Sequence, residues 1–210
     1  GGAYLDLTSG TAGPLREILR ADDHFIISQW DNGPAGMFPG VGIRHMLDVP
    51  GGEYEQWFII ASPGHPFLAE VLEQVVSNIE NYNHFVFGLG GDGVLNVTGP
   101  NAYTLAIRRL EKGQPCRRIC AWPEGLRYTM LEDLHAHQRL DKGHYGRMMF
   151  SPVTPEGLTG LELLRFELLD KLYRPVALFE RIAKSIRPWN YRRLARRRAR
   201  KLAQQAPPPQ

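Results

Sequence analysis

Apolar residues recur along the first 130 positions in patterns that alternate between strand and helix. Short runs rich in β-branched and aromatic residues predict strands, and the glycines and prolines between them predict turns. The segments that fit a strand are 3–7, 24–30, 54–61, 94–97, 118–122 and 126–130. The first of these is apolar enough to predict a buried strand that delivers Asp6 to its end.

Four stretches carry apolar residues at helical spacing. The clearest is 65–82, because Pro66 suits a first helical turn and one apolar stripe follows it. A short helix is expected within 11–20, and another around 103–110 that Thr98 would cap. Residues 156–186 also predict helix, with Pro175 dividing the stretch in two. Strands interleaved with helices favour an α/β fold with a mainly parallel or mixed sheet.

Two glycine-rich segments separate these elements. Residues 31–52 are rich in glycine and proline and predict a long loop, which in compact domains usually carries function. Residues 88–93 (GLGGDG) look like a phosphate cradle but lack the Lys-Ser/Thr of a P-loop. Because a strand is expected next, they are interpreted as a flexible turn, with Asp92 as an outside candidate for a polar contact.

Composition and charge narrow the class of protein. The 210 residues, 43% hydrophobic and 22% charged, suit one globular domain, and no apolar run reaches the roughly 18 residues of a membrane span. Residues 187–210 hold eight basic residues and no acidic one, which leaves 17 basic and 22 acidic residues before them. This mildly acidic body does not favour specific nucleic-acid recognition. Cys116 and Cys120 are too few for a zinc set and suggest a reduced, intracellular setting.

Two groups of polar residues are candidates for chemistry. Asp6, at the end of a strand beside glycines, would be placed to hold a divalent cation that clamps a diphosphate; the alternative is a turn or helix cap. Glu55 and Gln56 follow a Gly-Gly turn, so they would bind sugar hydroxyls while Trp57 stacks on a sugar face. The alternative there is a solvated strand edge with a core Trp. His65 is expected to cap its helix, and the pair His135 and His137 to lie on the surface.

Three segments resemble one family in the same order along the chain. GGAYLDL (1–7) resembles a GG-x-Y-x-D-x-D pattern, ASPGHPFL (61–68) resembles a helix entry, and NVTGPNAYTLAI (96–107) resembles a TGP segment before a helix. The family is that of glycosyltransferases with a DXD sugar-binding region, including yeast outer-chain mannosyltransferases and bacterial capsular polysaccharide enzymes. The resemblance covers roughly residues 1–110.

This resemblance implies a GT-A type fold and retaining transfer of a sugar from a nucleotide-sugar donor to an acceptor hydroxyl. Asp6 would contact the donor and hold Mn²⁺ or Mg²⁺, although Thr8 stands where the family has its metal-binding Asp. The catalytic candidates are Asp6, Gln56 and Glu55. The candidates for donor and sugar binding are Gly2, Tyr4, Asp6, Thr8, Thr98, Gly99 and His144.

The expected organisation is a catalytic region over 1–155, a helical extension over 156–186 and a basic, disordered tail over 187–210. The nucleotide-binding half of such a domain is expected to precede Gly1. The expected partners are a nucleotide-sugar and a glycan or lipid-linked acceptor, with cytoplasmic location and peripheral membrane contact through Arg187–Lys201. Non-specific nucleic-acid binding or a solvated helix are alternatives for that tail. The alternative function is a non-catalytic carbohydrate- or partner-binding module on the same fold.

Overall fold

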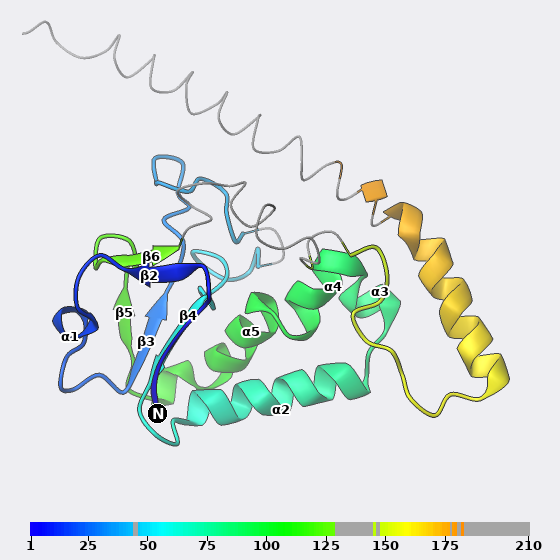
Figure 1. The fold of residues 1–210 in the computed structure, drawn as a ribbon, viewed down its shortest axis with the longest axis horizontal. Helices are drawn as coiled ribbons and strands as arrows, with labels where there is room; N and C mark the ends of the chain where they lie inside the picture. Colours follow the sequence, from blue (N-terminus) through cyan, green and yellow to red (C-terminus); the bar gives the residue numbers. More distant parts are fainter. Residues whose placement is uncertain (44–45, 129–144, 146–147, 177, 180–181, 183–210) are drawn as a thin grey trace, which may run out of the picture.

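The computed structural model describes residues 1–43, 46–128, 145, 148–176, 178–179 and 182. Within these ranges the chain is a mixed α/β structure with a four-stranded sheet and a separate two-stranded sheet (Figure 1). The larger sheet has the order β1-β4-β3-β5, with strands Gly2–Leu5, Phe58–Ala61, Phe25–Ser28 and Arg117–Ile119. The smaller sheet pairs β2 (Ser9–Thr11) with β6 (Leu126–Tyr128).

Strand direction decides where the polar residues of the larger sheet meet. β4 is antiparallel to both β1 and β3, and β5 is parallel to β3. Leu5 at the end of β1 pairs with Phe58 at the start of β4. The ends of β1, β3 and β5 and the beginning of β4 therefore lie along the same edge of the sheet.

Two apolar clusters cover the two faces of the larger sheet. α2 (Pro66–Glu80) and α5 (Pro100–Leu110) lie together along one face (Figure 1), where they bury a cluster formed by Phe25, Ile27, Tyr54, Ala61, Phe67, Tyr103 and Ile107. The other face packs beneath α1 (Leu15–Ile18) and β6, with the cluster Ile18, Ile26, Trp57, Phe58, Ile60, Ala121 and Leu126. Successive residues Ile26 and Ile27 thus point to opposite sides, as in any strand.

Several expected elements are confirmed. All four residues of β3 are buried, and α2 and α5 occupy the two best helical patterns. The expected strands at 54–61, 118–122 and 126–130 appear in shorter form as β4, β5 and β6. Residues 129 and 130, at the end of the third expected strand, lie outside the described residues. His65 caps α2, because its ring nitrogen Nδ1 accepts a hydrogen bond from the Phe67 amide at 3.3 Å.

The expected burial of the first strand is wrong. Three of the four residues of β1 are exposed, because β1 is an edge strand that pairs only with β4. A division of the C-terminal helix at Pro175 is also wrong, since residues 160–176 are helical without a break. A proline removes one hydrogen bond and does not always end a helix.

Most of the glycine-rich segment 88–93 and the strand expected at 94–97 instead form one helix, α4 (Gly90–Val97), which follows the short helix α3 (His84–Phe87). Gly90 has φ +55° and donates its amide to the Phe150 carbonyl, and a Cβ there would lie 2.2 Å from the Met148 carbonyl oxygen. The missing side chain at Gly90 therefore allows the backbone at Met148–Phe150 to pack directly against the start of α4. Thr98 ends α4 and does not cap α5, whose N-cap is Gly99.

A buried ion pair holds the start of β5 to the turn before β3. Arg117 donates from Nε to Oδ1 of Asp23 at 2.6 Å and from Nη2 to Oδ2 at 2.7 Å, and also to the Ile18 carbonyl. These hydrogen bonds hold the pKa of Asp23 below its usual value. The side chains are only 15% and 6% exposed, so the pair is largely shielded from solvent.

We expect Asp23→Asn to lower the free energy of unfolding by about 2 kcal/mol at pH 7, because it leaves a buried guanidinium without its counter-charge. Asp23 has a lowered pKa in the folded state, so its stabilising effect is lost as the pH falls below the unfolded value of 3.8. Urea unfolding at neutral and at acidic pH measures both effects. Asp22→Asn, at an exposed neighbour, is the control. If Asp23→Asn and Asp22→Asn lowered the free energy of unfolding equally, the ion pair between Asp23 and Arg117 would make no contribution of its own.

Candidate functional site

Polar side chains from four strands gather at the shared edge of the larger sheet. Asp6 follows β1, Asp31 lies just beyond β3, Glu55 precedes β4 and Cys120 follows β5. The amide of Asp6 donates to the carbonyl of Trp57 at 2.8 Å, which continues the pairing of β1 and β4 past their ends. The edge therefore brings together residues that lie up to 114 positions apart between Asp6 and Cys120.

A small pocket opens at this edge, with about 360 Å³ of empty space when the open space at its mouth is included. Its lining comes from the ends of β3 and β5, the entry to β4 and the loop after β3. The residues are Gln29, Asp31, Met37, Phe38, Glu55, Trp57, Cys120, Ala121, Trp122 and Pro123. Two indoles and a phenyl ring thus stand beside two carboxylates, and none of the lining residues among those the structure describes is a lysine or arginine.

Glu55 is the buried carboxylate of the pocket. It is only 5% exposed, and burial raises its pKa to about 7. The polar hydrogens of Ser28 and Trp57 favour the ionised form and oppose this shift, while the charge of Glu53 adds to it. Among the described residues, neither Oε2 of Glu55 nor Nε1 of Trp57 completes a hydrogen bond of good geometry. Both atoms have almost no accessible surface, so a ligand in the pocket would reach them only if the pocket wall moved.

The loop after β3 forms part of this pocket. Asp31 accepts the Met37 amide at its Oδ2 and the Phe38 amide at its carbonyl, each at 2.8 Å. The Phe38 ring then packs edge-to-face against Trp30 and Trp122, with centroid distances of 5.9 and 6.0 Å. The long glycine-rich loop therefore contributes Asp31, Met37 and Phe38 to the pocket wall, and its functional role stays a prediction.

A cluster of hydroxyl groups surrounds Asp6. The phenol of Tyr4 donates to Oδ1 of Asp6 at 2.7 Å, which raises the pKa of Tyr4. Burial first, and then the charges of Tyr145 and Asp6, raise the pKa of Tyr128, whose hydroxyl also bonds to Thr8. Burial of its hydroxyl end and the charges of Glu53 and Asp6 raise the pKa of Tyr145, although that residue as a whole is 40% exposed.

The Asp6 cluster and the pocket share one wall. Tyr128 stacks on Trp57 with a centroid distance of 5.1 Å and an interplanar angle of 1°. The turn at Asp6 is closed by its backbone carbonyl, which accepts both the amide and the hydroxyl of Ser9. Because the turn uses the backbone, the Asp6 carboxylate is not needed as a turn or cap residue.

The described residues around Asp6 do not form a metal site by themselves. Within the described ranges, no three His, Cys, Asp or Glu side chains are arranged to hold a metal ion. Asp6 offers one carboxylate among hydroxyls, whereas Mn²⁺ and Mg²⁺ favour several charged oxygens. Among the described residues, therefore, no set of side chains fits the Mn²⁺ or Mg²⁺ that the family resemblance implies.

The other predicted residues lie apart from the pocket. Gln56 points to the helical face of the sheet, opposite to Glu55, and its amide donates to the Thr98 carbonyl at 3.4 Å. Thr98, and Gly99 next to it, therefore lie on the same side of the sheet as Gln56 and on the opposite side from Glu55. Gly2 pairs with Ala61 at the far end of β1, so its predicted role in donor binding is not supported by its position. His135, His137, His144 and the tail Arg187–Lys201 lie outside the described residues.

Sequence reasoning missed several residues of the site. Asp31 follows the expected strand 24–30 and Trp122 is the last residue of the expected strand 118–122, so the rule that sites form beyond the carboxyl ends of strands could have pointed to this edge. Tyr128 and Tyr145 carried no local signal. Cys120 lines the pocket, but burial and the charges of Asp31 and Glu55 raise the pKa of its thiol, which disfavours the reactive thiolate.

Comparisons of the chain with models of protein families, with curated proteins and with solved structures find no match. The function is therefore argued from the site and from the three sequence segments. Across the part of the chain that the structure describes, no helix is long and apolar enough to cross a membrane.

Proposed function

We propose that the protein is a glycosyltransferase that moves a sugar from a nucleotide-sugar donor to a hydroxyl of a glycan or lipid-linked acceptor, with retention, on a GT-A type fold. The observation that carries this proposal is the meeting of Asp6 and Glu55 at one sheet edge. Both residues were candidates from sequence. Glu55 lines the pocket together with Trp57 and Trp122, whereas Asp6 lies outside the lining and is joined to it through its amide, which donates to the Trp57 carbonyl.

The chemistry of the pocket suits a neutral sugar. Carboxylates accept hydrogen bonds from sugar hydroxyls, and indole rings pack on the apolar C–H faces of a sugar ring. Glu55 and Asp31 supply the carboxylates of the lining, and Trp57 and Trp122 supply the indole rings. A diphosphate would meet these carboxylates unfavourably, because the described lining residues include no lysine or arginine. Arg118 and Arg127 contact the lining residues Gln29 and Trp122 but do not themselves line the pocket. The pocket is therefore assigned to a sugar and not to the phosphates.

In the proposed reaction the bond between the anomeric carbon and the diphosphate oxygen breaks, and its electron pair leaves on the diphosphate. The acceptor oxygen forms the new bond on the same face, and the acceptor proton passes to the departing diphosphate oxygen. The Asp6 carboxylate would stabilise the positive charge that develops on the sugar ring. Glu55 would orient a sugar hydroxyl, so that catalysis depends chiefly on positioning.

A non-catalytic carbohydrate-binding module is the second candidate. Thr8 occupies the place of the family's second Asp, and its hydroxyl bonds to Tyr128. The same pocket would then hold a sugar without the groups that stabilise a leaving diphosphate. Binding without release of the sugar from a donor distinguishes this module from the enzyme.

We expect at least one nucleotide-sugar to bind with a dissociation constant in the range of about 1 µM to 1 mM and to be hydrolysed or transferred slowly. Calorimetry with a panel of UDP- and GDP-sugars measures binding, and chromatography of the released sugar measures turnover, each with and without Mn²⁺. UDP and GDP without a sugar are the controls, because the pocket is assigned to the sugar.

The outcomes separate the two candidates. Release of sugar supports the transferase, and its dependence on Mn²⁺ shows whether a metal assists. Binding of free sugars without any release from a donor supports the module. Failure of every donor and every free sugar to bind would contradict both.

A further inference from the structure

The C-terminal helix of the described chain has two different faces. Residues 160–176 are helical, and the described residues 178–179 and 182 beyond them are helical too. It follows the segment at 148–159 and lies at the side of the molecule next to α3, drawn in yellow and orange in Figure 1. One face packs against α3, and another is exposed and apolar.

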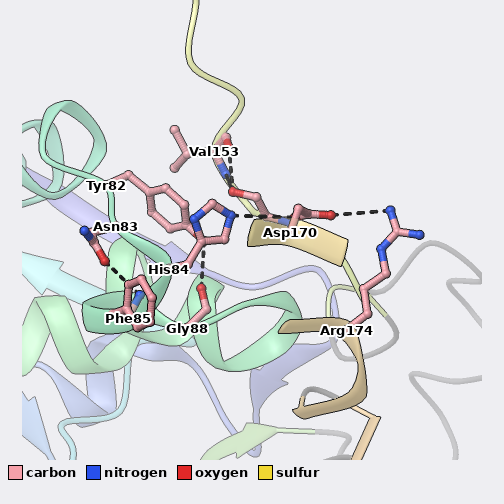
Figure 2. A network of polar contacts seen from close by, with 9 residues as sticks. Tyr82, Asn83, His84, Phe85, Gly88, Val153, Asp170 and Arg174 are labelled. Atoms are coloured by element: carbon pink, nitrogen blue, oxygen red, sulfur yellow. Dashed lines mark hydrogen bonds and ion pairs between the residues drawn. The ribbon is translucent and has the colours of Figure 1, made fainter. Parts of the chain in front are cut away.

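The packed face is held by aromatic and polar contacts. Phe166 packs on His84 and Tyr173 packs edge-to-face on Phe85, with centroid distances of 4.7 and 5.1 Å. Asp170 accepts the Ser151 amide at 2.7 Å, and its Oδ1 lies 3.9 Å from Nε2 of His84 (Figure 2). These contacts fix which side of the helix faces the protein.

The exposed face carries a continuous apolar stripe. At 100° per residue its members fall within an arc of about 120°, which is one face of a helix. Each member is between 49% and 79% exposed, and the stripe consists of Leu161, Leu164, Leu168, Leu172, Val176, Phe179 and Ile182. Scattered exposed apolar residues need no explanation, but a stripe of seven on one helix indicates a surface that is covered in use.

The same helix contains too many charges to cross a membrane. Glu162, Arg165, Glu167, Asp170, Lys171 and Arg174 recur through its length. At the same 100° per residue, Arg165 falls within the arc of the apolar stripe and Lys171 lies at its border, where long basic side chains can extend to lipid headgroups. An apolar face flanked by basic residues is typical of a helix that lies in the plane of the interface.

We propose that the stripe Leu161–Ile182 docks on an anionic phospholipid surface, with the helix lying in the interface. Charge complementarity favours this occupant: residues 187–201, which follow the helix, hold eight basic residues and no acidic one. The acidic remainder of the chain, with 22 acidic and 17 basic residues, would be repelled by the same surface. The C-terminal region is therefore the part of the chain that would meet the membrane. This inference does not depend on the proposed function.

The test is co-sedimentation of the full chain with vesicles of phosphatidylcholine alone and of phosphatidylcholine mixed with phosphatidylserine. We expect binding to the mixed vesicles and little to the neutral ones, with binding weakening as salt is added. The variant Leu168→Asp with Leu172→Asp should weaken vesicle binding at least tenfold. Both positions are exposed, so thermal unfolding of the variant should match that of the wild type.

A matched control comes from α2, which has its own exposed apolar residues. Leu72→Asp with Val76→Asp adds the same two charges at side chains that are 66% and 51% exposed. This control should retain vesicle binding, because α2 is not part of the stripe. A further variant, with Arg196, Arg197, Arg198 and Arg200 changed to Gln, should weaken binding and reduce its salt dependence.

Several results would overturn the inference. Equal vesicle binding by Leu168→Asp with Leu172→Asp and by the control would show that the stripe does not touch lipid. A dimer in analytical ultracentrifugation that this variant dissociates, without vesicle binding by the wild type, would assign the stripe to a second copy of the chain. Binding to duplex DNA and not to vesicles would assign the basic run to nucleic acid.

Discussion

Replacing Asp6 by Asn is expected to lower the rate of sugar transfer or donor hydrolysis by at least about a hundredfold. The substitution removes the negative charge that would stabilise the developing positive charge on the sugar. It leaves the turn intact, because Ser9 bonds to the backbone carbonyl of Asp6 and the Asp6 amide bonds to Trp57. The rate is measured with the donor that the binding panel identifies, and thermal unfolding shows whether the fold is kept.

Tyr4→Phe is the matched control for Asp6. It removes the hydrogen bond from the Tyr4 phenol to Oδ1 of Asp6 but keeps the carboxylate. We expect a loss smaller than that of Asp6→Asn. If Asp6→Asn stayed within threefold of the wild-type rate, Asp6 would not contact the reacting sugar. If it unfolded instead, Asp6 would be a structural residue.

Replacing Glu55 by Gln is expected to change the pH dependence of stability by up to about 3 kcal/mol. The pKa of Glu55 rises from 4.5 in the unfolded chain to about 7 in the fold. The folded protein therefore binds the proton more tightly than the unfolded chain does. Its contribution to stability is fully present below pH 4.5 and is lost as the pH rises through about 7.

At pH 8 the wild type holds a buried, ionised Glu55, whereas the Gln variant holds a neutral amide of the same shape. Glu55→Gln should therefore be the more stable protein at pH 8, and the difference should narrow toward pH 5. Urea unfolding across this range measures the effect, and Glu80→Gln, at an exposed position on α2, is the control. Parallel stability curves for the wild type and Glu55→Gln would contradict the raised pKa.

The same variant tests the proposed role of Glu55 in catalysis. If Glu55 orients a sugar hydroxyl, the variant should bind the sugar more weakly, and the pH at which wild-type activity changes should lie near its pKa of about 7. We therefore expect Glu55→Gln to be more stable than the wild type at pH 8 and also less active. Ionisable groups with strongly shifted pKa values concentrate at functional sites, where they lower stability.

The clearest elements were predictable from local pattern. α2 follows from five apolar residues at helical spacing after Pro66, and β3 follows from a run of apolar residues that is buried on both faces. Asp6, Glu55 and Gln56 could be selected because polar residues at strand ends are often functional. Local pattern was ambiguous for the short apolar run Val94–Val97, which could have been a strand or a helix. It is helical in the structure, where α4 packs against α5 and the Met148 backbone packs against Gly90 at the start of α4.

The site itself depended on long-range pairing. The pairing of β1 with β4 left β1 exposed at the sheet edge and brought Asp6 beside Trp57. The alternation of side chains along the chain before β4 sent Glu55 into the pocket and Gln56 to the opposite face. The sequence by itself thus determined which segments form strands and helices, and which polar residues stand at their ends. Only the tertiary structure decided which ends meet and which side chains share a pocket, because strand order, direction and register arise from contacts between distant segments.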